Sequence, residues 1–131
     1  MRPSPIPLDD FSQPEKFFFP PRAYTSPAFH DFELDAVWRT QWVAVGRAEE
    51  IPNVGDYFTI SIGPEPLIIV RDEPDAFIAL SAVCRHRSMV IAEGSGHCKG
   101  RFVCPYHAWT YDRRGNLIGA PQTGPDFDKS K

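Results

Sequence analysis

Cys84-Arg85-His86-Arg87 and Cys104-Pro105-Tyr106-His107 are the two stretches that decide the fold of this chain. Each stretch offers one thiol and one imidazole as possible metal ligands. Side chains so close in sequence face the same metal centre only if the backbone turns sharply between them, and Pro105 stiffens the second turn by fixing its own φ angle. Two sulfur and two nitrogen ligands suit iron, zinc or an iron–sulfur cluster.

The two stretches resemble the Rieske motif, in which two histidines replace two cysteines on one iron of a [2Fe–2S] cluster. They are similar to the version found in the α-subunits of Rieske non-haem iron oxygenases. The resemblance implies that Cys84 and Cys104 bind the inner iron, and that His86 and His107 bind the outer iron near the surface. Weaker similarities flank the motif at residues 24–27, 42–46 and 117–121.

Two other interpretations of these residues are a structural zinc site and no metal at all. Zinc sites also combine two cysteines with two histidines, but their spacings differ and they rarely mix the two types as Cys-x-His. A metal-free role fits each residue singly, but not two mixed pairs inside an extended motif. Cys98 has no partner in the motif and is predicted to be a free thiol with a structural role. His30 and His97 are predicted to be surface residues, not ligands.

Composition is that of one small globular domain. The chain has 131 residues, 42% of them hydrophobic and 13% aromatic, which is enough for a core. Its net charge is −3 and no basic stripe appears, so nucleic acid is not an expected partner. No apolar run approaches the ~18 residues of a membrane span. Three cysteines, two of them assigned to metal, leave no pair for a disulfide, so the cytoplasm is the expected compartment.

The pattern along the chain predicts three parts: an arm and helix at 1–38, a Rieske [2Fe–2S] domain at 39–123, and the start of a linker at 124–131. Residues 1–27 hold half of the chain's 14 prolines, so an extended arm without regular structure is expected up to about Tyr24. Ser26 is the predicted N-cap of one short helix, with Pro27 at its first position. Apolar residues at helical spacing follow, which is typical of a packing helix.

From Trp42 onward, short strands separated by turns predict a mainly β chain, an antiparallel β-sandwich of the Rieske type with both ligand pairs on loops at one tip. Residues 57–62 alternate as a half-buried strand, whereas the apolar run 67–70 predicts a central one. The other predicted strands are 76–80, 101–103 and 109–111, and a turn at 113–116 leads to a last strand at 117–118. The glycine-rich stretch between the ligand pairs is predicted to bend freely.

Two positions depart from patterns common among the relatives. Ser88 stands where many members carry glycine, so the hydrogen bonding of the first ligand loop need not follow theirs. Trp109 stands two residues after the second histidine, where relatives of high potential carry a serine that donates a hydrogen bond to a cluster sulfur. We therefore expect a reduction potential toward the low end of the Rieske range.

The resemblance implies an electron-transfer domain of a mono- or dioxygenase. In that family a reductase or ferredoxin reduces the cluster, and the electron then reaches a mononuclear iron, typically in the neighbouring subunit of a trimer. That Fe(II) binds two histidines and a carboxylate, and no histidine follows His107 here. We therefore expect the mononuclear iron only in a further domain that this chain lacks, and no turnover of substrate by this chain alone.

The alternative function is a free-standing Rieske-type ferredoxin, which carries electrons but belongs to no oxygenase. Ferredoxins of this kind are usually shorter and lack residues equivalent to 1–38. The additional arm and helix therefore favour the oxygenase interpretation.

Overall fold

A computed structural model of the chain describes residues 21–124 and 126–130. They belong to two compact units, the first ending at Ala44 and the second beginning at Val45. Most of the predicted extended arm, including the apolar residues 17–19, lies outside the described residues. No helix in the described part is long and apolar enough to cross a membrane.

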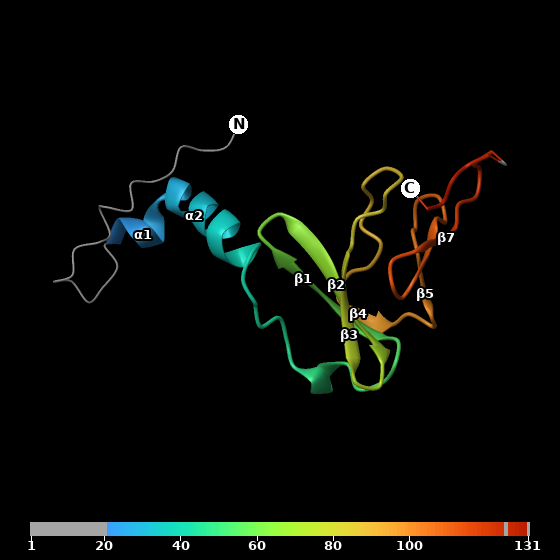
Figure 1. Ribbon diagram of the computed structural model, residues 1–131, viewed down its shortest axis with the longest axis horizontal. Helices are drawn as coiled ribbons and strands as arrows, with labels where there is room; N and C mark the ends of the chain where they lie inside the picture. Colours follow the sequence, from blue (N-terminus) through green and yellow to red (C-terminus); the bar gives the residue numbers. More distant parts are fainter. Residues whose placement is uncertain (1–20, 125, 131) are drawn as a thin grey trace. The chain divides into compact units, whose positions relative to one another are not determined.

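The first unit is helical. Its elements are α1 (Pro21–Thr25), α2 (Pro27–Glu33) and a π-helical turn, η2 (Leu34–Trp38), that continues α2 (Figure 1). The predicted N-cap is confirmed, because the Ser26 side chain accepts a hydrogen bond from the backbone N–H of Phe29 at 3.4 Å. The helix α1 was not expected, since prolines early in the chain favoured an extended arm up to Tyr24.

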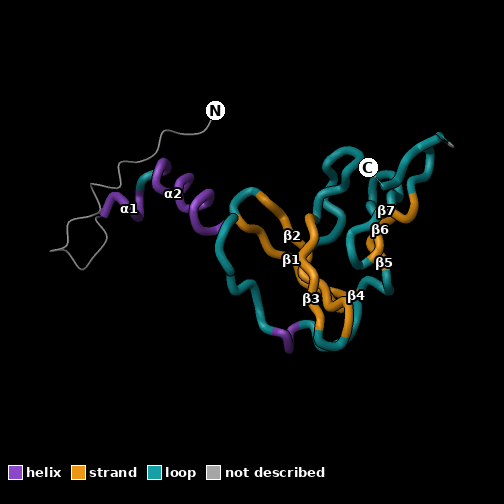
Figure 2. Tube along the Cα trace, viewed as in Figure 1, coloured by secondary structure: helices purple, strands orange, loops and turns teal. Residues whose placement is uncertain are grey.

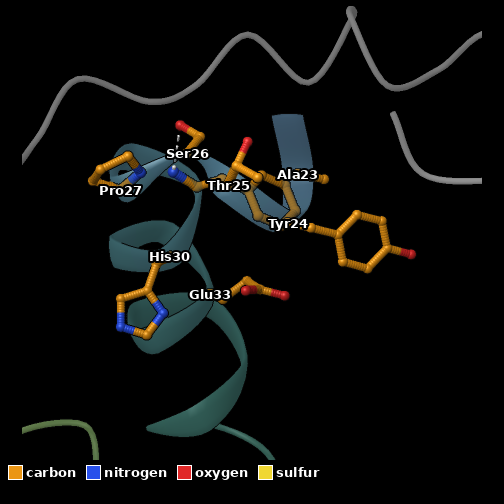
Figure 3. A pocket seen from close by; sticks show the side chains of 8 residues that line it. Ala23, Tyr24, Thr25, Ser26, Pro27, His30 and Glu33 are labelled. Atoms are coloured by element: carbon orange, nitrogen blue, oxygen red, sulfur yellow. Dashed lines mark hydrogen bonds between the residues drawn. The ribbon is translucent and has the colours of Figure 1, made fainter. Parts of the chain in front are cut away.

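An open hollow lies where α1 meets α2, and Figure 3 shows its lining residues. His30 and Glu33 extend from α2 beside it, and His30 is exposed, as predicted. The helices α2 and η2 contain no buried residue. Phe29 and Phe32 lie against each other on α2, with ring centroids 6.1 Å apart.

The second unit begins with a short 3₁₀ helix, η3 (Ala48–Glu50), followed by a four-stranded antiparallel sheet (Figure 2). Its spatial order is β3-β2-β1-β4. The strands are β1 (Asp56–Ile62), β2 (Glu65–Glu73), β3 (Ala76–Ser81) and β4 (Ser95–His97).

The strand β2 is central, as the apolar run predicted. It pairs with β1 on one side and with β3 on the other, and Ile68, Ile69 and Val70 in its middle are buried. Ile68 and Val70 share a core cluster with Ala82, Cys98 and Phe102. The edge strand β4 was not predicted, because its sequence is the glycine-containing Ser-Gly-His that was expected to be loop.

A second sheet of three short antiparallel strands follows: β5 (Arg101–Val103), β6 (Thr110–Asp112) and β7 (Leu117–Gly119). The predicted turn at 113–116 joins β6 to β7. Asp112 closes that turn by accepting hydrogen bonds from the backbone N–H groups of Arg114 and Asn116, at 2.8 and 2.9 Å. The predicted mainly β, antiparallel fold is therefore confirmed.

Candidate metal centre

The four predicted ligands lie on two loops that have the same backbone design. An isolated bridge between Val83 and Val90 closes the first loop, residues 84–89. The pair Val103–Thr110, between β5 and β6, closes the second loop, residues 104–109. The two loops therefore have equal length, and each begins with its cysteine.

The hydrogen bonds inside the loops also match. Cys84 donates its backbone N–H to the carbonyl of Met89 at 2.8 Å, and its carbonyl accepts from Ser88 at 2.9 Å. Cys104 makes the equivalent bonds with Trp109 and Ala108, at 2.8 and 3.0 Å. This pairing folds each loop back on itself.

Both loops place a non-glycine residue in the left-handed region four positions after the cysteine. The φ angle is 53° at Ser88 and 56° at Ala108. Glycine adopts such angles without steric cost. Ser88 therefore holds a left-handed conformation that glycine would adopt at lower steric cost.

Replacing Ser88 with glycine is therefore expected to raise the free energy of unfolding by about 0.5–1 kcal/mol, because it relieves the left-handed strain. Urea denaturation of the cluster-loaded protein measures this. The matched control is Ser61→Gly, at an exposed position inside β1, where glycine should lower stability by about 0.5–1 kcal/mol. A loss of stability in Ser88→Gly would contradict the strain argument.

The two sulfur atoms lie together in the interior. Cys84 and Cys104 are 2% and 3% exposed, and both belong to a core cluster with Trp109, Tyr111 and Leu117. Burial raises the pKa of the Cys84 thiol, but hydrogen bonds from Tyr111, from Cys104 and from the backbone N–H groups after Cys84 outweigh burial and lower it. The environment therefore favours a thiolate, which is the form that binds metal.

The two imidazoles form a second pair. The ring centroids of His86 and His107 are 4.7 Å apart, and the exposed His86 is the more accessible of the two. Burial, with the positive charges of His86 and Arg87, lowers the pKa of His107, which favours the neutral ring that ligates metals. The Nδ1 atom of His107 is buried and has no hydrogen-bond partner among the described residues.

Aromatic rings cover both imidazoles. Trp109 stacks on His86 with ring centroids 4.8 Å apart and planes 8° apart, and Tyr106 stacks on His107 with centroids 3.8 Å apart. Trp109 is 7% exposed, and it also contacts the ring of Phe127, with ring centroids 5.4 Å apart. The indole at this position packs against a candidate ligand, where a serine would donate a hydrogen bond.

Tyr111 is a residue of the site that the sequence did not identify. Its hydroxyl lies 3.4 Å from the sulfur of Cys84 and accepts the backbone N–H of Arg85 at 3.1 Å. Because the oxygen is used as an acceptor for Arg85, its proton is free to be donated to the sulfur. Burial and the bond to Cys84 raise the pKa of Tyr111 to about 12, so the hydroxyl stays protonated. A tyrosine in a predicted strand carries no local signal of this role.

The remaining cysteine and histidines lie elsewhere. Cys98 is buried in the core cluster of the four-stranded sheet, together with Ile68 and Phe102, and not in the cluster of Cys84 and Cys104. His97 is exposed on β4 and bonds the carboxylate of Asp56 through Nδ1 at 2.9 Å. All three cysteines are free thiols.

The donor set fits a binuclear cluster. The site offers a buried sulfur pair and a more accessible nitrogen pair, the division that a Rieske cluster makes between its two irons. The unpartnered Nδ1 of His107 is a nitrogen for which such an iron supplies a partner.

Comparisons with known proteins agree with this geometry. The family model described as the Rieske [2Fe-2S] domain matches residues 41–128. Choline monooxygenase of Arabidopsis thaliana is 40% identical over 88% of this chain and 26% of its own length. Benzene 1,2-dioxygenase subunit alpha of Pseudomonas putida is 36% identical over 82% of this chain and 24% of its own length. The chain thus spans about a quarter of these relatives.

A solved structure gives the same result for the fold. It is a quaternary ammonium Rieske monooxygenase, described in connection with carnitine oxidation by gut microbiota and inter-subunit electron transfer. The superposition has a TM-score of 0.78 at 33% identity, and it covers 86% of this chain and 31% of that one.

Proposed function

Since this chain belongs to the Rieske [2Fe-2S] domain family, we propose that Cys84 and Cys104 hold the inner iron of its cluster and that His86 and His107 hold the outer iron. One observation carries the proposal: two loops of matched backbone bring the sulfurs together in the core and the imidazoles together beside them. The unpartnered His107 Nδ1 supports this ligand set.

When bound, the cluster supplies a site that accepts and releases one electron. The residues of the chain prepare for this role in different ways. The buried cysteines provide thiolates away from water, and Tyr111 donates a hydrogen bond to one of them. Trp109 holds the ring of His86 in one orientation by stacking. The exposed face of His86 gives an electron a short route to a protein bound at this surface.

The larger activity that the site supports best is electron transfer within a Rieske non-haem iron oxygenase. Its support is the similarity to oxygenase subunits of both the monooxygenase and the dioxygenase kind. The catalytic reaction would need a mononuclear iron outside the residues of this chain. Aromatic rings and quaternary ammonium compounds are both candidate substrates. A free-standing ferredoxin remains the second candidate, and the helices at residues 21–38 favour the oxygenase.

The electron donor in this proposal is a reductase or a ferredoxin. Arg85 and Arg87 flank the exposed His86 and are themselves exposed, which suits an acidic donor surface.

A homo-oligomer, such as a trimer, would allow electron transfer between subunits, as described for one relative. None of the three cysteines forms a disulfide, which suits a reducing compartment such as the cytoplasm. The domain boundaries proposed above, residues 39–123, overlap the family match.

Purified chain is expected to contain about two irons and two acid-labile sulfides per molecule, as a [2Fe–2S] cluster requires. Iron, zinc and sulfide assays on protein made with iron supplied measure this. After one-electron reduction by dithionite, the electron paramagnetic resonance signal should integrate to one spin per cluster. Stoichiometric zinc without sulfide would refute the proposal.

A further inference from the structure

A second group of charged side chains lies outside the metal centre and joins the two sheets. Asp72, at the end of β2, is 4% exposed and accepts hydrogen bonds from Arg113 Nε at 3.0 Å and from Arg114 Nε at 2.8 Å. Arg113 also donates to the backbone carbonyl of Asp72 at 3.2 Å, and Arg114 donates to Glu73 at 2.8 Å. We call these four residues the Asp72 cluster.

Both arginines belong to the turn between β6 and β7. The turn is closed internally by Asp112, which accepts bonds from Arg114 and Asn116. Gly115 at its tip lies against β3, because a Cβ at this position would be 3.1 Å from the side chain of Leu80. The Asp72 cluster therefore fixes a rigid turn of the second sheet onto the end of the first.

The strand that enters this turn carries Tyr111, two residues before Arg113. The position of the Tyr111 hydroxyl relative to Cys84 depends on where β6 lies, since Cys84 follows β3 of the other sheet. Two contacts across the sheets thus constrain one short strand: Tyr111 with Cys84, and Arg113 with Asp72. The side chain of Arg113 is partly exposed to solvent, but the Asp72 carboxylate that it contacts is buried.

We propose that Asp72 is a positioning residue for the metal centre: by holding Arg113 and Arg114 it sets the distance between the Tyr111 hydroxyl and the Cys84 sulfur, and so helps to set the reduction potential. The proposal rests on the ligand assignment above. Arg113 holds the carboxylate below its usual pKa, so Asp72 is ionised and both guanidinium bonds are charge-assisted.

A simple stabilising ion pair and a direct electrostatic effect make different predictions from positioning. A simple ion pair would change stability and leave the potential unchanged. A direct charge effect would change the potential by the same amount whether or not Tyr111 has its hydroxyl. Positioning acts through the hydroxyl, so its effect disappears when the hydroxyl is removed. A double-mutant cycle separates the three.

The test is protein-film voltammetry of the cluster-loaded chain carrying Asp72→Asn, Tyr111→Phe, both or neither. The Asn side chain keeps the size of Asp72, but its NH2 group cannot accept a hydrogen bond, so one of the two arginine bonds is lost and the other loses its ionised acceptor. When Tyr111 is present, we expect Asp72→Asn to lower the reduction potential by at least half as much as Tyr111→Phe does. In the Tyr111→Phe background, we expect Asp72→Asn to lower the potential by less than a quarter of the Tyr111→Phe shift. Equal shifts in both backgrounds, or none in either, overturn the inference.

Two further variants keep the test decisive. Arg113→Lys preserves the charge but loses the paired hydrogen bonds to Asp72. A double-mutant cycle of Arg113→Lys with Tyr111→Phe should therefore give the same pattern as the cycle of Asp72→Asn with Tyr111→Phe. If Asp72→Asn does not retain the cluster, Arg113→Lys is used in its place. Unchanged potential in Arg113→Lys overturns the inference. Glu65→Gln, at the exposed start of β2 and outside the Asp72 cluster, is the matched control and should not shift the potential; an equal shift there would also overturn the inference.

The failure of this inference differs from failure of the ligand assignment. If the wild-type chain binds no [2Fe–2S] cluster, the proposed function fails. If the cluster is present and Tyr111→Phe shifts its potential, but the Asp72→Asn effect is independent of the hydroxyl, only the positioning role fails.

Discussion

Replacing Cys104 with serine should abolish the cluster, whereas replacing Cys98 with serine should leave it intact. Changes in residues that only support metal ligands typically cost about 10–100-fold in affinity, so the loss of a ligand should reduce the iron content below detection. Cys98 packs with Ile68 and Phe102 in the other core cluster and serves no ligand role in our assignment. Both variants remove one buried sulfur, which makes them a matched pair.

Iron and sulfide assays on the two purified variants, with visible spectra, check this expectation. Circular dichroism controls for folding, because serine leaves a buried hydroxyl at either position. Loss of the cluster from Cys98→Ser while its fold is retained would show that the ligand set is wrong. Retention of a normal cluster in Cys104→Ser would show the same.

The second large effect is expected on the reduction potential when Tyr111 is replaced with phenylalanine. The hydroxyl donates to the Cys84 sulfur, whose negative charge grows on reduction, so the bond stabilises the reduced state more. A hydrogen bond to a charged group contributes about 1.5–3 kcal/mol. We take about 1 kcal/mol of this energy as the amount by which the bond stabilises the reduced state more than the oxidised state. Removing the bond in Tyr111→Phe then lowers the potential by about 40 mV, since about 59 mV corresponds to a tenfold change in the equilibrium constant for one electron.

Voltammetry at neutral pH measures the shift. The wild-type potential itself should lie toward the low end of the Rieske range of about −150 to +300 mV, because Trp109 packs on His86 where a serine would bond a cluster sulfur. An unchanged or higher potential in Tyr111→Phe would contradict the assigned hydrogen bond. A wild-type value well above zero would contradict the argument from Trp109.

The parts of the fold that the sequence predicted well are those with a local signal. The buried run in β2 and the strand β5 were predicted because apolar residues alternate or cluster within short windows bounded by turn residues. The ligand loops were predicted from the mixed Cys/His spacing, and the structure brings the two thiols and the two imidazoles together.

Apart from the helix α1, the features that were missed depend on contacts between distant residues. The strand β4 is held at a sheet edge by backbone pairing with β1, to which its glycine-containing sequence gives no clue. Tyr111 meets Cys84 across a sequence separation of 27 residues. Arg113 meets Asp72 across 41, and such pairings follow from the relative placement of two sheets, not from any local pattern.

The ligand assignment is tested most directly by pulsed electron paramagnetic resonance on the reduced wild-type protein and on His107→Ala. The wild type should show two strongly coupled histidine nitrogens, from His86 and His107, on a signal that integrates to one spin per cluster. In His107→Ala the coupling of one nitrogen, or the whole signal, should be lost. A reduced cluster without nitrogen coupling in the wild type, or an unchanged two-nitrogen pattern in His107→Ala, would contradict the assignment.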